Sequence, residues 1–220
     1  MQLGHSHTLI IAAAIIAASS LRASAGQPSV HVDTDEKAHA AHVRASIDIA
    51  APPAAVWGVI TDCARQPQIV PNLESCRIVK HDPAGRWDIR EHIINWTALL
   101  PKLRTVVRTS YDAGRRMLFK RVDGDMRISE GEWRVEPMAN ARASRLYYTA
   151  LVAPKMPVPQ FMVEHTVQTD LPNVLRAIER ASVADATKHG TAAAAHPKAG
   201  TQVSKSDLRD LDAVFPLARE

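Results

Sequence analysis

Residues 45–79 read ASIDIAAPPAAVWGVITDCARQPQIVPNLESCRIV, and this stretch decides the fold. Apolar and polar residues alternate up to Ile49, which is the period-two pattern of a half-buried strand. Pro52-Pro53 ends that strand, and proline suits the first turn of a helix. A second short helix is predicted over residues 65–70, before another strand begins. This order of one strand, two short helices and a second strand is uncommon, and it sets what the rest of the chain must supply.

The middle of the chain is predicted to be a meander of antiparallel strands. Connections rich in Gly, Asp, Asn and Pro separate runs with the composition of strands, which favours hairpins between neighbours. With the first strand over 43–49, the sheet has seven strands, and the others are 74–80, 87–94, 103–111, 115–121, 128–135 and 145–153.

One long helix is predicted after Pro159. Apolar residues recur there at three- and four-residue steps, as in an amphipathic helix, up to about Ala184; they are Val163, Val167, Leu171, Val174 and Ile178. Pro172 predicts either a kink or a restart of the helix at Asp170.

The start of the chain predicts export, and the expected destination is the periplasm. Residues 8–21 are apolar or small, and Ala23-Ser24-Ala25 fits the small-x-small pattern of signal peptidase sites. Residues 1–25 are therefore expected to be a signal peptide, with Gly26 as the first mature residue. No Lys or Arg precedes the apolar run, unlike in most signal peptides. An uncleaved anchor is the alternative, although a membrane helix needs about 20 apolar residues.

The remaining boundaries follow from composition. Residues 26–41 are polar and aperiodic and are expected to be a linker, so the single folded domain spans 42–184. Residues 185–220 offer little apolar surface to offset the entropy of ordering, and we expect a disordered or weakly docked tail.

Two cysteines, Cys63 and Cys76, flank a short loop. In an oxidising compartment such a pair is expected to form a disulfide, and two buried thiols are the alternative.

The opening stretch also carries a family resemblance. IDIAAPPAAVW (47–57) and VPNLES (70–75) resemble the START-like (SRPBCC) superfamily, whose relatives include polyketide cyclase/dehydratase-like and coenzyme Q-binding proteins. GEWRV (131–135) and PKMPVP (154–159) resemble its penultimate strand and the approach to its closing helix. The resemblance implies an α+β helix-grip fold, with a curved antiparallel sheet around the C-terminal helix and an apolar cavity between them. Members bind lipids, sterols, polyketides or quinone-like molecules, and some are cyclases or dehydratases, so the fold alone does not choose a function.

Strand parity predicts which residues face that cavity. One parity holds mostly large apolar residues, and the other is charged, as on a solvated face: Asp88, Arg90, His92, Arg104, Arg108, Arg116, Lys120, Glu132 and Arg134. Alternation alone equally describes a solid core, so the cavity rests on the resemblance. The predicted ligand-binding residues are Trp87, Ile89, Glu91, Ile93, Val107, Phe119, Trp133, Tyr148 and His165.

Polar chemistry inside the cavity is expected from few residues. Glu91 and His165 are candidate acid or base groups, with a rim carboxylate and a surface histidine as the respective alternatives. We predict no catalytic residue, since no nucleophile elbow, phosphate loop, zinc-protease motif or dinucleotide fingerprint occurs. We also predict no metal site and no cofactor, because the histidines of the amino-terminal segment lack accompanying Cys or paired carboxylates.

The predicted partner is a hydrophobic small molecule. The net charge of +4 is spread along the chain, which excludes the basic stripe of a nucleic-acid-binding protein. Trp96, Leu99 and Leu100 lie in an apolar connection that either touches membranes or folds into the core. The sequence favours an exported, monomeric carrier or sensor. The alternative is a cyclase or dehydratase acting on an enclosed polyketide or isoprenoid, and a protein-interaction module fits an exported chain poorly.

Overall fold

The fold is a curved antiparallel sheet with one long helix packed against it, and the computed structural model describes residues 26–35, 37, 39–95, 101–155 and 159–189. The sheet has eight strands in the order β1-β2-β8-β7-β6-β5-β4-β3. The strands are β1 (Ser29–Asp35), β2 (Ala40–Ile49), β3 (Leu73–His81), β4 (Trp87–Ile94), β5 (Leu103–Asp112), β6 (Arg116–Gly124), β7 (Met126–Met138) and β8 (Ala143–Pro154). The helices are α1 (Pro53–Thr61), the single 3₁₀ turn η1 (Cys63–Arg65), α2 (Gln66–Ile69) and α3 (Gln160–His189). The predicted helix-grip α+β architecture is therefore confirmed.

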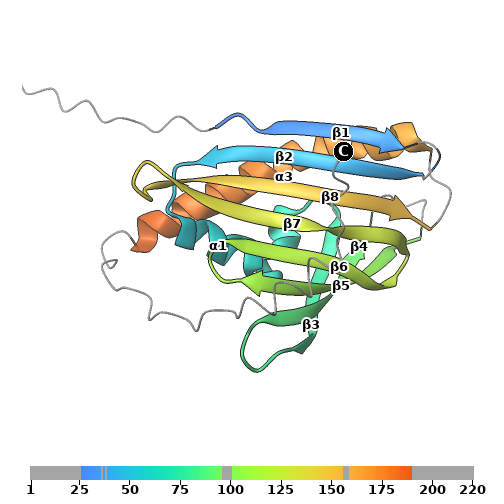
Figure 1. Cartoon of the computed structure of the whole chain (residues 1–220), viewed down its shortest axis with the longest axis horizontal. Helices are drawn as coiled ribbons and strands as arrows, with labels where there is room; N and C mark the ends of the chain where they lie inside the picture. The colour runs from blue at the N-terminus through green and yellow to red at the C-terminus, as the bar shows by residue number, and fades with distance from the viewer. Residues whose placement is uncertain (1–25, 36, 38, 96–100, 156–158, 190–220) are drawn as a thin grey trace, which may run out of the picture.

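The helices cover one face of the sheet. In Figure 1, α3 runs behind β1, β2 and β8, and the short helices lie behind the middle strands. α3 packs against α1, β1 and β2, and α1 also contacts β7 and β8. The core between these layers includes Ile47, Ile49, Val56, Leu146 and Leu175, none more than 2% exposed. The inward parity of β2 and the apolar stripe of α3 thus supply the two sides of one core.

The amino-terminal linker prediction is wrong for part of its length. Residues of β1, which fall inside the segment 26–41, pair with β2 from Ser29↔Ser46 to Asp35↔Ala40. Val30 and Val32 pack against the main core. Two apolar residues at period two are a weak signal among His, Asp and Thr, but β2 and α3 supply the surface that orders them. β1 is thus the strand by which the eight-stranded sheet exceeds the seven strands predicted from the sequence.

The closing helix is longer than predicted. α3 continues to His189, five residues past Ala184, so the predicted tail boundary at 185 also falls inside a helix. Arg65 Nη1 donates to Asp185 Oδ2 at 2.5 Å, which ties this last turn to η1. Pro172 lies inside the helix and no restart occurs at Asp170.

The β3 side of the sheet is held by the predicted disulfide. Cys63 in η1 and Cys76 in β3 are bonded, with their Cα atoms 5.4 Å apart. β3 is an edge strand, and its pairing with β4 shifts register between Leu73 and Ser75 and again between Ile78 and Lys80. The bridge therefore joins the short helices to an irregular edge.

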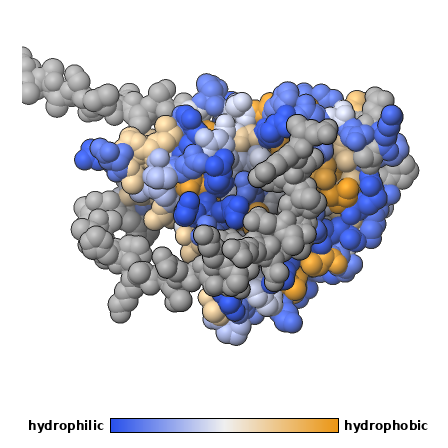
Figure 2. All heavy atoms as spheres, viewed as in Figure 1, coloured by the Kyte–Doolittle hydropathy of each residue, from blue (hydrophilic) through white to orange (hydrophobic). Residues whose placement is uncertain are grey.

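The outer face of the sheet is charged. Figure 2, which views this face, shows a mainly hydrophilic surface with smaller hydrophobic areas. The predicted solvated residues of β5, β6 and β7 form ion pairs there, such as Arg104 with Asp123 and Arg134 with Glu136. Among the residues that the structure describes, no helix has the length and apolar composition to cross a membrane.

Candidate ligand-binding site

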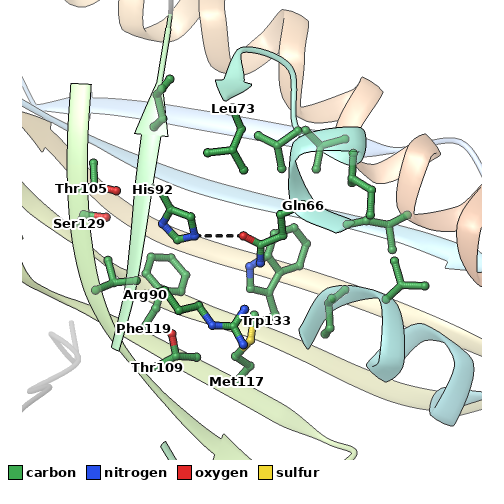
Figure 3. Close-up of a pocket in the computed structure, with 18 residues that line it drawn as sticks. Gln66, Leu73, Arg90, His92, Thr105, Thr109, Met117, Phe119, Ser129 and Trp133 are labelled. Carbon is green, nitrogen blue, oxygen red and sulfur yellow. Dashed lines mark hydrogen bonds between the residues drawn. The ribbon is translucent and has the colours of Figure 1, made fainter. Parts of the chain in front are cut away.

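A cavity of about 220 Å³ lies between the sheet and the helices. Its wall comes from α1, α2, α3 and from strands β3 to β7, and most of it is apolar. Figure 3 shows the apolar side chains, among them Leu73, Met117, Phe119 and Trp133, around a smaller set of polar ones. The polar lining residues are Gln66, Arg90, His92, Thr105, Thr109 and Ser129. The predicted cavity is therefore present, with more polar groups than expected.

The predicted orientation of β4 is wrong. Trp87, Ile89, Glu91 and Ile93 were expected to face the helices, but Asp88, Arg90, His92 and Ile94 occupy the inner face. The cross-strand register gives the reason, because Arg90 lies opposite Val107 and His92 opposite Thr105, both of which line the cavity. Trp87 is instead covered on the outer face by the Arg108 guanidinium, 5.0 Å from its ring.

Arg90 is the centre of a buried polar cluster. Its side chain is 3% exposed and Nε donates to Asp88 Oδ1 at 2.9 Å. Nη2 donates to Asp88 Oδ2 at 3.0 Å and to the Thr61 carbonyl oxygen at 2.8 Å, at the carboxyl end of α1. Tyr111 donates to Asp88 Oδ2 at 2.5 Å, and Nη2 also donates to the Tyr111 hydroxyl. Burial raises the pKa of Tyr111 far above its usual value, so this hydroxyl keeps its proton.

One nitrogen of Arg90 has no protein partner. Nη1 is fully buried and makes no hydrogen bond within the described residues. In Figure 3 the guanidinium extends into the cavity toward Trp133 and Met117. A buried N–H without an acceptor costs about 1–3 kcal/mol, so an acceptor atom that reached Nη1 from the cavity, with the small side-chain shift that its lack of exposure requires, would be favoured.

His92 and Gln66 form a second polar pair on the same wall. His92 Nε2 lies 3.0 Å from Gln66 Oε1, and because an amide oxygen only accepts, Nε2 carries the proton. Burial, assisted by the positive charge of Arg90, lowers the pKa of His92 to about 4. His92 is thus neutral near pH 7, and its Nδ1 remains an acceptor.

Aromatic rings form the back of the cavity. Tyr148 packs against Trp133 at 4.3 Å between ring centroids and stacks on Phe119 at 6.2 Å. Burial raises the pKa of Tyr148 to about 12. Gly131 lies between Phe119 and Ala150, where an added Cβ would stand 2.0 Å from the carbonyl oxygen of Thr149. Only glycine leaves the space that these rings fill.

Three of the nine predicted ligand-binding residues line the cavity: Val107, Phe119 and Trp133. Tyr148 contacts two of the lining rings without being one of the lining residues itself. Their role in ligand binding stays a prediction.

Glu91 and His165 lie away from the cavity. Glu91, on the outer face, accepts hydrogen bonds from Arg77 Nη2 and Arg104 Nε, both at 2.7 Å, and these bonds lower its pKa. His165 is exposed on the first half of α3. The register of β4 with β5 places three other predicted residues on the outer face with Glu91: Trp87, Ile89 and Ile93. Trp96, Leu99 and Leu100 lie outside the described residues.

Sequence reasoning missed Arg90, His92 and Gln66. The signal that could have found the first two is cross-strand pairing, since the correctly oriented Val107 and Thr105 fix the face of their partners on β4. Gln66 had no such signal, because α2 is a single turn whose orientation depends on the disulfide-linked segment around it.

A curved sheet that encloses an apolar cavity under one long helix defines a helix-grip binding fold. The chain belongs to the family described as polyketide cyclase / dehydrase and lipid transport, whose model matches residues 49–179, more than half of the 220 residues.

Solved structures with the same fold are distant in sequence. The chain is similar to the ZhuI aromatase/cyclase of Streptomyces sp. R1128 (17% identity, TM-score 0.55, covering 72% of this chain and 100% of that one). It is also similar to human STARD10 (13%, 0.61, 76% and 73%) and to a STAR-related lipid transfer protein of Xanthomonas axonopodis (17%, 0.60, 71% and 94%). At these identities the likeness concerns the fold. No curated protein matches the sequence.

Proposed function

We propose that this protein is an exported carrier or sensor that binds a hydrophobic small molecule in the cavity between the sheet and α3. The observation that carries the proposal is the combination of an apolar wall with one buried guanidinium whose Nη1 has no acceptor in the part of the chain that the structure describes. A site of this kind buries the body of a ligand by apolar contact and orients it with a few polar groups. The names of the similar structures, an aromatase/cyclase and lipid transfer proteins, support the same class of ligand.

The polar groups narrow the chemistry of the ligand. Asp88 already balances the charge of Arg90, and His92 is neutral, so a ligand carboxylate would add an unbalanced charge to the cavity. A neutral carbonyl oxygen on Arg90 Nη1 and a hydroxyl donor on His92 Nδ1 would satisfy both groups. The ligand we infer is apolar and carries a ketone- or quinone-like oxygen at one end.

Cavity size favours a compact ligand. About 220 Å³ is below the range of about 300–1,000 Å³ that is usual for small-molecule sites. A quinone-like or short polyketide ring system therefore fits this cavity better than a two-chain lipid, which would require the helices to move outward.

Two features support export. The leader-like residues 1–25 precede the first described residue, and the Cys63–Cys76 bridge is typical of an oxidising compartment. The periplasm is the compartment that we propose.

Ligand capture is tested by native mass spectrometry of gently purified protein, followed by extraction and identification of the bound molecule. Val107→Phe, which places a ring into the cavity, should remove the co-purifying mass. Val122→Phe on the exposed part of β6, 49% exposed, is the matched control and should retain it. A wild-type protein that carries no ligand after purification from its native host, and binds none from a total lipid extract, would overturn the proposal.

Membrane contact at one end of the molecule is the second part of the proposal. Phe161 and Met162, 71% and 42% exposed, lie in the first turn of α3, close to where β8 ends (Figure 1). Lys155 is exposed nearby, and apolar side chains beside a cation suit an anionic lipid surface. We propose that a monomer touches the membrane here. Membrane contact through Trp96, Leu99 and Leu100, which lie outside the described residues, stays a separate prediction from the sequence. Liposome flotation with Phe161→Asp should show loss of binding, and retention equal to wild type would remove this role.

A cyclase or dehydratase is the alternative, and the cavity favours it in one respect. Arg90 Nη1 can polarise a substrate carbonyl, and His92 Nδ1 can accept a hydrogen bond from an enol. The candidate catalytic positions are thus Arg90 and His92 rather than His165 or Glu91, which lie outside the cavity. Turnover of a co-purified polyketone that is lost in His92→Phe while binding persists would identify an enzyme; a carrier shows binding without product.

A further inference from the structure

Glu179 is a buried carboxylate on the side of α3 that covers β1 and β2. It is 8% exposed, although glutamate is rarely buried without a partner. Ser182, one turn further along the same face, is 0% exposed, and its Oγ has no hydrogen-bond partner within the described residues. Two polar side chains are therefore buried on this side of α3.

The nitrogen of Gly26 lies at this carboxylate. Burial raises the pKa of Glu179, and a hydrogen bond from the main-chain N–H of Gly26 lowers it. Arg180 and Arg176, the charged neighbours on α3, act in the same direction as Gly26 through their charge alone. The carboxylate thus has a neutral main-chain N–H as its hydrogen-bond donor.

Gly26 is held closely at this position. A Cβ on residue 26 would stand 2.5 Å from the carbonyl oxygen and 2.8 Å from the main-chain nitrogen of Asp48, so no other residue fits without moving the backbone. The Asp48 carboxylate is engaged elsewhere, since it accepts from Arg145 Nε at 2.5 Å and Nη2 at 2.7 Å.

Ala23-Ser24-Ala25, the small-x-small pattern of a signal peptidase site, ends immediately before this glycine. We propose that cleavage after Ala25 turns the Gly26 nitrogen into an ammonium group that forms a buried ion pair with Glu179, so that removal of the leader locks β1 onto α3. In this hydrolysis water adds across the Ala25–Gly26 peptide bond, the new carboxylate leaves with the leader, and the amine takes up a proton. The inference rests on the proposed export.

The physical reason is charge balance. A single neutral N–H leaves a buried carboxylate poorly compensated, whereas an ammonium group supplies the opposite charge and three donors. The unprocessed chain lacks that charge. Processing would therefore be coupled to the stability of the edge strand.

The test is a thermal-denaturation cycle on chains that begin at Gly26. Such chains are made with a site-specific protease that leaves glycine first, and each is compared with its N-acetylated form, which keeps the N–H but removes the charge. In the wild-type sequence the free amine should raise the melting midpoint by at least about 3 °C over the acetylated form. In Glu179→Gln the difference should vanish, and in Glu164→Gln, a control on the same helix, it should persist.

A second measurement covers the case in which Glu179→Gln does not fold. The free Gly26 amine of the wild-type chain should react slowly with an acylating reagent at pH 8, because a paired ammonium holds its proton. We expect a rate at least about tenfold lower than that of the free amine of a peptide with residues 26–35. Equal midpoints for free and acetylated wild-type chains, or acylation at the peptide's rate, would overturn the inference.

The amino terminus of the secreted protein separates this inference from the proposed function. Mass spectrometry should find Gly26 as the first residue. A different first residue overturns the inference and leaves the ligand proposal standing, whereas a protein that starts at Gly26 and never carries a ligand overturns the ligand proposal alone. A chain retained with its leader overturns export, and the processing step with it.

Discussion

Replacement of Arg90 by methionine is the sharpest test of the buried cluster. Methionine fills similar space but leaves Asp88, 5% exposed, with the Tyr111 hydroxyl as its only side-chain partner among the described residues. Removing one member of a buried ion pair costs about 3–5 kcal/mol. The Thr61 carbonyl oxygen also loses a hydrogen-bond donor, and we count the cost of this loss within the same range. Since domains are stable by about 5–15 kcal/mol, Arg90→Met should lose from about a fifth of the stability to all of it.

Urea denaturation followed by circular dichroism measures this loss. Arg108→Met is the matched control, because Arg108 lies on the outer face and only covers the Trp87 ring, so its cost should stay below about 1 kcal/mol. Adding Asp88→Asn to Arg90→Met removes the unpaired charge of Asp88, while the amide oxygen still accepts a hydrogen bond from Tyr111. The double variant should therefore recover at least about 1 kcal/mol of the free energy of unfolding. An Arg90→Met protein no less stable than Arg108→Met would contradict this role of the cluster, and so would a double variant less stable than Arg90→Met alone.

Three further predictions concern the bridge, the back of the cavity and the response to pH. Reduction of Cys63–Cys76, or Cys63→Ser with Cys76→Ser, should cost about 3 kcal/mol, measured by urea denaturation with and without reductant; an unchanged midpoint contradicts it. Gly131→Ala should destabilise the protein severely, because its Cβ would meet backbone atoms of β8. Gly58→Ala in α1, where a Cβ meets nothing within 4 Å, should stabilise it by up to about 1 kcal/mol. Similar melting midpoints for the two variants would count against the close packing at Gly131. His92 has a folded pKa of about 4, below its unfolded value of about 6.5. Its contribution to the free energy of unfolding is therefore complete above pH 6.5 and falls by roughly 3 kcal/mol as the pH drops to 4. NMR titration should show His92 at most about one-tenth protonated at pH 5, and a titration midpoint near 6.5 would contradict its burial.

Most of the fold was predictable because it depends on local patterns. The alternation of β2 and the helical spacing of Leu171, Val174 and Ile178 each identify an element and its buried face without knowledge of its neighbours. Cys63 and Cys76 likewise fit a disulfide from their spacing and the expected compartment.

The site was less predictable because its residues depend on partners distant in sequence. On β4 the alternation correctly separates two faces, but a strand with Trp87 and Ile89 on one side appears to have its apolar face there. Arg90 can be buried only because Asp88, Tyr111 and the end of α1 satisfy it, and no pattern within β4 reveals these contacts. The same holds for β1, which is ordered by β2 and α3 rather than by its own composition.

The irregular pairing of β3 has a consequence for behaviour at high concentration. As the last strand of an open sheet, β3 would offer its free side to another molecule, and long regular margins of this kind promote polymerisation. The two register shifts bend that margin. Chains that meet there find no straight row of main-chain groups to extend, so we expect a crowded solution of this protein to form no filaments.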